Sequence, residues 1–117
     1  MAKKILVVDD EPDIRDYLCS YLEDEGFATM EAEDGHVAMD KIMAEIPDLI
    51  LLDLQMPEET GTGFYRKLHH KKELKDIPVI VISGMAGRDI AVSKSVPVFE
   101  KPIDKEELLK SIQQILD

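Results

Sequence analysis

Residues 49–57 read LILLDLQMP, and this short segment carries the main clue to the architecture of the chain. Its first four residues are aliphatic, which is typical of a strand that is covered on both faces of a sheet. Asp53 then interrupts the apolar run. Because an ionised carboxylate without a partner is very unfavourable in an apolar interior, we expect Asp53 to emerge at the end of its strand, where neighbouring groups compensate its charge.

Four other short apolar runs lie along the chain, and helical patterns alternate with them. The runs are ILVV at 5–8, FATM at 27–30, IPVIVI at 77–82 and VPVF at 96–99. Apolar residues recur at helical spacing at 14–25, 38–46 and 108–116, and residues 61–76 hold a weaker, more polar helix. Apolar strands that alternate with helices predict an α/β fold, in which helices cover both faces of a parallel sheet.

Residues typical of helix ends support two of these helices. Pro12 occupies a first-turn position, and Gly26 follows the first helical pattern, as glycine commonly does where a helix ends. Asp104 and Glu107 precede the last apolar stripe in an arrangement like a capping box. We therefore expect the last helix to start at Asp104.

Length, charge and cysteine content limit the classes of protein that fit. The 117 residues, 44% of them apolar, suit one domain over residues 1–117. A net charge of −11 argues against direct binding of nucleic acid or anionic membranes and favours proteins or cations as partners. Cys19 is the only cysteine, and no targeting or membrane-spanning segment stands out, so we expect a cytoplasmic protein.

Polar residues follow four of the five predicted strands. They are Asp9 and Asp10, Asp53, Ser83, and Glu100 with Lys101. The carboxyl ends of parallel strands meet at one edge of a sheet, where ligands of such folds bind. Two like charges about 4 Å apart repel by roughly 4 kcal/mol at an effective dielectric constant of about 20, so clustered carboxylates favour a divalent cation or a proton. Oxygen ligands suit Mg²⁺, and the sequence predicts a magnesium site there.

A magnesium site next to a lysine and a hydroxyl also suits phosphoryl transfer. A metal that bridges Asp53 and an incoming phosphoryl group would neutralise oxygens that otherwise repel the nucleophile. Lys101 and Ser83 would contact the remaining phosphoryl oxygens. The expected product is an aspartyl phosphate.

Four motifs occur in a specific order and spacing. They are VVDDE at 7–11, LLDLQMPEETG at 51–61, VIVISG at 79–84 and EKPI at 100–103. Together they resemble the receiver domain of two-component response regulators along essentially the whole chain, in the manner of the stand-alone chemotaxis regulators. The resemblance implies a flavodoxin-like, doubly wound sheet of five parallel strands in the order 2-1-3-4-5, with helices on both faces.

The resemblance also implies a function and roles for particular residues. Asp53 would accept a phosphoryl group from a phosphohistidine of a sensor histidine kinase or a histidine phosphotransfer protein. Mg²⁺ would be held by Asp9, Asp10, Asp53 and the backbone carbonyl of Gln55. Ser83 and Lys101 would contact the phosphoryl group and change the surface around residues 84–100. Such a protein is a signalling switch that catalyses only its own phosphorylation and slow dephosphorylation, and not an enzyme acting on a metabolite.

The chain departs from the family pattern in two places. Only 17 residues separate Ser83 from Lys101, a few fewer than usual, so the family's fourth helix is expected to be short or irregular. The family's switch aromatic usually lies three residues before the lysine, where this chain has Val98. Phe99 is one residue away and should point to the opposite face of its strand, which puts its role as the switch aromatic in doubt.

Simpler roles for these residues and two other functions are also compatible with parts of the pattern. Asp10 or Glu11 could cap the helix that Pro12 opens, Asp53 could be a satisfied carboxylate at a strand end, and Ser83 could be a turn residue. A haloacid dehalogenase-type phosphatase also uses an aspartate nucleophile with Mg²⁺, but it needs a second acid at the position of Gln55. A receiver-like interaction module that works without phosphorylation is the remaining alternative.

Overall fold

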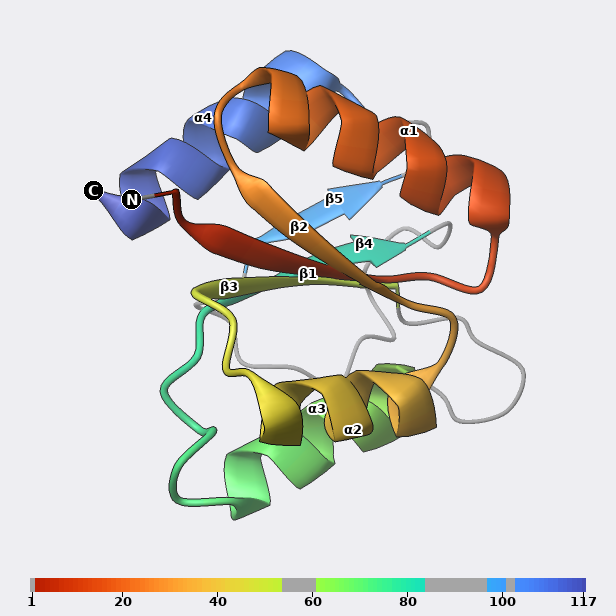
Figure 1. Ribbon diagram of the computed structural model, residues 1–117, viewed down its shortest axis with the longest axis vertical. Helices are drawn as coiled ribbons and strands as arrows, with labels where there is room; N and C mark the ends of the chain where they lie inside the picture. The colour runs from red at the N-terminus through yellow and green to blue at the C-terminus, as the bar shows by residue number, and fades with distance from the viewer. Residues whose placement is uncertain (1, 54–60, 84–96, 101–102) are drawn as a thin grey trace.

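The computed structural model describes residues 2–53, 61–83, 97–100 and 103–117 (Figure 1). Within these ranges, strands and helices alternate along the chain, as the apolar runs predict. The segment 84–96, where the short or irregular fourth helix of the family is expected, lies outside the described residues.

A single parallel sheet forms the middle layer of the molecule. Its strands are β1 (Lys4–Val8), β2 (Ala28–Ala32), β3 (Leu49–Asp53), β4 (Val79–Ser83) and β5 (Val98–Glu100). They lie side by side in the order β2-β1-β3-β4-β5, and each neighbouring pair is parallel. The predicted five-stranded sheet and its strand order are therefore confirmed.

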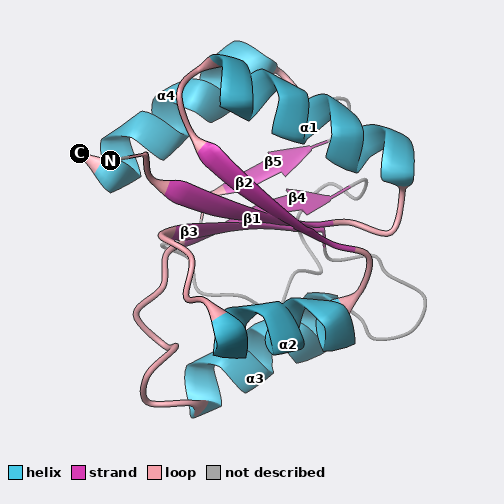
Figure 2. Ribbon diagram, in the orientation of Figure 1, coloured by secondary structure: helices cyan, strands magenta, loops and turns pink. Residues whose placement is uncertain are grey.

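Within the described ranges, two helices lie on each face of the sheet (Figure 2). They are α1 (Pro12–Asp24) and α4 (Lys105–Leu116) on one face, and α2 (Gly35–Ala44) and α3 (Gly61–His70) on the other. Among the described residues, no helix has the length and apolar character needed to cross a membrane. The doubly wound arrangement predicted for the chain is confirmed.

The residues of β3 show how the sheet supplies both halves of the core. Leu49 and Leu51 pack in the cluster under α1 and α4, whereas Ile50 and Leu52 pack in the cluster beneath α2 and α3. Side chains alternate across a strand, so a continuous aliphatic run fills both clusters at once. All four side chains are fully buried.

The start of α1 does not show the capping hydrogen bond that Asp10 or Glu11 could provide. Glu11 occupies the N-cap position, but its side chain makes no capping hydrogen bond. Instead, the backbone N–H of Glu11 donates to the Asp9 carboxylate over 2.9 Å. At the other end, Gly26 has a φ of 95°, a left-handed conformation that glycine adopts without strain.

One detail of the predicted α2 helix is wrong. The apolar stripe predicts a helix that continues to Ile46, but the helix ends at Ala44. Ile46 precedes Pro47, and the proline ring disfavours the helical conformation of the residue before it. Ile46 is consequently 55% exposed, and Met43, which lies within the helix, is 64% exposed.

Cys19 is buried in the cluster under α1 and α4. Burial raises the pKa of its thiol to about 11, and a hydrogen bond with Thr29 only partly offsets this. The thiol therefore stays protonated near neutral pH and acts as a small apolar side chain.

The α4 helix begins with the predicted cap. The Asp104 carboxylate accepts hydrogen bonds from the backbone N–H groups of Glu106 and Glu107, over 3.1 and 3.2 Å. We expect Asp104→Ala to lower the free energy of unfolding by about 0.5–2 kcal/mol, because these donors lose their acceptor. Urea unfolding followed by circular dichroism measures the change. Asp104→Asn keeps an acceptor oxygen and serves as the control; equal losses in both variants would contradict the capping role.

Candidate functional site

Three carboxylates converge at the carboxyl edge of the sheet. Asp9 follows β1, Asp10 comes next, and Asp53 is the last residue of β3. Each offers a carboxylate oxygen, and these three oxygens lie within 4.8 Å of one another. The predicted convergence of Asp9, Asp10 and Asp53 is therefore observed, and we call these three residues the acidic cluster.

The register of the two central strands explains why Asp9 and Asp53 meet. Val8 of β1 lies beside Leu52 of β3, so the next residues along the two strands are Asp9 and Asp53. Paired residues of neighbouring strands point to the same face of a sheet, and the next residue along each strand points to the other face. The two aspartates therefore point to the same side. Asp9 is 2% exposed and Asp53 is 1% exposed. Asp53 thus ends a buried strand next to a second buried carboxylate.

Three hydrogen bonds hold Asp9 where β1 leaves the sheet. Its backbone N–H donates to the carbonyl of Ala32 over 3.1 Å, which extends the pairing with β2. Its carboxylate accepts from the backbone N–H of Glu11. Its carbonyl accepts from Nη1 of Arg15 over 2.6 Å.

Arg15 is the residue that the sequence reasoning missed. It lies about one turn into α1, close to the positive end of the helix dipole, where a cation is usually unfavourable. That unusual placement was the available signal. A partner elsewhere was needed to offset it, and the structure places Glu31 and the Asp9 carbonyl there.

The acidic cluster has the chemistry of a site for a hard divalent cation. Its donors are all carboxylate oxygens, and two of the three belong to buried side chains. Hard cations such as Mg²⁺ prefer oxygen ligands and offset the mutual repulsion of clustered carboxylates. The residues present therefore fit a metal ion.

The remaining predicted site residues are only partly described. Ser83 ends β4, and its backbone pairs with Glu100 of β5. Since Ile82 lies beside Asp53, the backbone of Ser83 is at the same edge of the sheet as the acidic cluster. Gln55 and Lys101 lie outside the described residues.

The two candidates for the switch aromatic position lie on opposite sides of β5. Val98 is exposed, whereas Phe99 is half-buried and packs against the cluster under α1 and α4. Val98 lies beside Val81 of β4 and Phe99 lies beside Ile82, and these successive residues point to opposite faces of the sheet. The structure therefore agrees with the expectation that Phe99 does not share the face of Val98.

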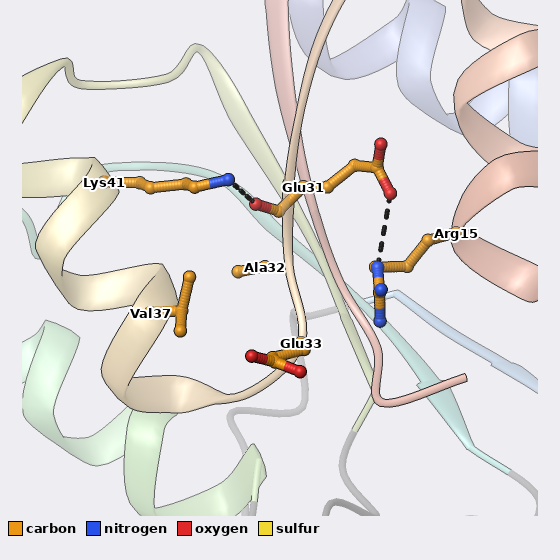
Figure 3. A pocket seen from close by; sticks show the side chains of 6 residues that line it. All are labelled: Arg15, Glu31, Ala32, Glu33, Val37 and Lys41. Atoms are coloured by element: carbon orange, nitrogen blue, oxygen red, sulfur yellow. Dashed lines mark hydrogen bonds and ion pairs between the residues drawn. The ribbon is translucent and has the colours of Figure 1, made fainter. Parts of the chain in front are cut away.

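An open pocket lies at β2, the outer strand of the sheet, and Arg15, which donates to the Asp9 carbonyl, lines it (Figure 3). Its volume is about 260 Å³. It is lined by Arg15, Glu31, Ala32, Glu33, Val37 and Lys41. Arg15 and Lys41 approach Glu31 from opposite sides of β2, and Arg15 Nε donates to the Glu31 carboxylate over 3.2 Å.

Comparison with known proteins places this arrangement in a family. The model of the response regulator receiver domain family matches residues 5–113. The phosphate regulon transcriptional regulatory protein PhoB of Escherichia coli is 34% identical over 120 residues, which cover 99% of this chain and 52% of PhoB. The chain therefore spans about half the length of this relative.

Solved structures agree with the sequence match. The chemotaxis protein CheY4 of Vibrio cholerae superimposes with a TM-score of 0.89 at 27% identity, over 99% of this chain and all of CheY4. The response regulator TrrA of Thermotoga maritima superimposes with a TM-score of 0.85 at 31% identity, over 97% of this chain and 99% of TrrA. These matches favour neither the phosphatase nor the phosphorylation-independent module. The chain belongs to the receiver domains of two-component response regulators.

Proposed function

We propose that Asp53 is the phosphoacceptor of this receiver domain and that the acidic cluster holds Mg²⁺. The observation that carries the proposal is the convergence of three carboxylates within 4.8 Å at the end of the central strands. Asp53 is the member that ends the buried β3 strand. The phosphoryl donor would be a phosphohistidine of a sensor histidine kinase or a histidine phosphotransfer protein.

The transfer exchanges one bond to phosphorus for another. A carboxylate oxygen of Asp53 forms the new O–P bond while the P–N bond of the phosphohistidine breaks, and the electron pair stays on the imidazole nitrogen. Bound Mg²⁺ would neutralise phosphoryl oxygens that the carboxylates otherwise repel. Asp9 and Asp10 would hold the ion together with Asp53, and the burial of Asp9 and Asp53 would limit the movement of their carboxylates.

Other residues enter the proposal through the family resemblance. The backbone carbonyl of Gln55 would be a further ligand of the ion, and Ser83 and Lys101 would contact the phosphoryl oxygens. A structure of the related TrrA was determined in complex with Mg²⁺–BeF, and this supports Mg²⁺ as the ion here. The chain would catalyse only its own phosphorylation and slow dephosphorylation.

Phosphorylation would act on a protein partner through a population shift. A coupling free energy of about 1–3 kcal/mol between Asp53 and the surface around residues 84–100 is enough to change that partner's affinity substantially. A net charge of −11 favours a protein target over direct contact with nucleic acid.

Intact mass spectrometry tests the proposal. We expect the wild-type protein, incubated with Mg²⁺ and acetyl phosphate, to gain one phosphoryl group of about 80 Da. The gain should vanish in Asp53→Ala and in wild-type protein treated with EDTA. Asp40→Ala is the matched control, because Asp40 is an exposed aspartate of α2 outside the acidic cluster. A folded wild-type protein that gains no mass would contradict the proposal and favour a module that works without phosphorylation.

A further inference from the structure

We propose that Arg15 is a positioning residue that fixes Asp9 in the acidic cluster, and that Glu31 holds Arg15 in place. The part of this inference that concerns cation binding rests on the proposed function. The part that concerns the geometry of Asp9 does not, and it can be tested without any metal.

The contacts of Arg15 join two parts of the chain that are distant in sequence. Nη1 donates to the Asp9 carbonyl over 2.6 Å, and Nε donates to the Glu31 carboxylate over 3.2 Å. The planar guanidinium presents several donors in a fixed fork, so one arginine makes both bonds, whereas the single ammonium of a lysine cannot reproduce that geometry. The Arg15 side chain is 16% exposed and Glu31 is 43% exposed. The pair is thus sheltered at the end that faces Asp9.

These contacts matter because Asp9 stands where the backbone leaves the sheet. Its N–H donates to the carbonyl of Ala32, and its own carbonyl accepts from Arg15. Asp9 is almost fully buried, and a buried carbonyl without a donor is costly. Arg15 supplies that donor and thereby fixes the peptide plane between Asp9 and Asp10. The orientation of both carboxylates in the acidic cluster depends on this plane.

Electrostatics and positioning predict opposite effects for the loss of Arg15. A positive charge near the acidic cluster repels a cation, so its removal would strengthen cation binding if Arg15 acted only through its charge. If Arg15 positions Asp9, its removal weakens binding, because residues that orient metal ligands typically contribute about 10–100-fold in affinity. The sign of the change therefore separates the two roles.

Lys41 provides a matched control on the other side of β2 (Figure 3). Its Nζ donates to the backbone carbonyl of Glu31, and it lines the same pocket as Arg15. It carries the same charge but is not among the hydrogen-bond partners of the Asp9 backbone. Lys41→Met thus removes a positive charge from the same pocket and leaves the Arg15–Asp9 bond intact.

The first measurement is the Mg²⁺ dissociation constant, by isothermal titration calorimetry, of wild type, Arg15→Met, Arg15→Lys, Glu31→Gln and Lys41→Met. We expect Arg15→Met to weaken binding about tenfold or more, and Lys41→Met to stay within about twofold of wild type. Arg15→Lys should recover part of the loss, because its ammonium can still donate to one acceptor. Glu31→Gln should have a smaller effect in the same direction. Equal or tighter binding by Arg15→Met would overturn the proposal.

A second measurement uses the metal-free protein. The amide of Glu11 is bonded to the Asp9 carboxylate, so its hydrogen exchange reports how firmly Asp9 is held. We expect Arg15→Met to exchange this amide about tenfold faster than Lys41→Met, while amides within β3 exchange equally in both. If wild type binds no Mg²⁺ but this difference is present, the proposed function fails and the positioning role stands. If the two variants exchange alike, the positioning role fails.

Discussion

Asp9→Asn is expected to stabilise the metal-free protein and to abolish its stabilisation by Mg²⁺. Three carboxylates share a space in which their oxygens lie within 4.8 Å, and two of the side chains are buried. Replacing Asp9 removes one negative charge, while the amide oxygen can still accept the hydrogen bond from the Glu11 backbone. Relief of like-charge repulsion should raise the free energy of unfolding by about 1–3 kcal/mol in EDTA at low ionic strength.

In the presence of Mg²⁺ the expected order changes, because the ion raises the free energy of unfolding of the wild-type protein. At a free Mg²⁺ concentration about 100 times the dissociation constant, binding should stabilise wild type by about 2.7 kcal/mol. Asp9→Asn should show little of this gain, because one of the three charged ligands is missing. Urea unfolding with and without Mg²⁺ measures both effects. Asp40→Asn, an exposed change of equal charge on α2, should alter neither. A wild-type protein that Mg²⁺ does not stabilise would contradict the metal assignment.

Phe64→Ala is expected to lower the free energy of unfolding by about 3–5 kcal/mol. Phe64 lies on α3, is fully buried, and packs in the cluster beneath α2 and α3. Its truncation removes the packing contacts of a large apolar side chain. It also leaves a cavity, because the surrounding core relaxes only in part. The loss is large relative to the total stability of most domains.

Thermal and urea unfolding measure this loss. Tyr17→Ala is the control, because Tyr17 is an exposed aromatic residue of α1 and its replacement should change stability by no more than about 0.5 kcal/mol. The acidic cluster is built from β1 and β3, so Phe64→Ala should retain Mg²⁺ binding in the fraction that stays folded. A loss below about 1 kcal/mol would mean that the core under α3 repacks around the smaller side chain.

Membership of the receiver family does not identify the protein on which this chain acts. The chain spans about half the length of PhoB. The departures of the sequence from the family pattern fall between Ser83 and Lys101. Val98 stands at the usual position of the switch aromatic, and Phe99 instead packs under α1 and α4.

Much of this architecture could be predicted from the sequence, because the deciding interactions are local or follow from topology. A few neighbouring residues are enough to recognise the strand that ends in Asp53. The same holds for the start of α1 at Pro12. The cap at Asp104 is local in the same way. The convergence of strand-end acids also follows from sequence, because the carboxyl ends of parallel strands must share one edge. The acidic cluster was therefore predictable residue by residue.

Only the tertiary structure decided which groups act on these elements from a distance. Arg15 reaches the Asp9 carbonyl because α1 packs beside the end of β1, and it reaches Glu31 because β2 is the neighbouring strand. Ile46 is exposed because the chain leaves the helical path before Pro47, although the apolar pattern continues. Periodicity describes one element at a time, whereas these contacts depend on register and packing between elements, which no local pattern encodes.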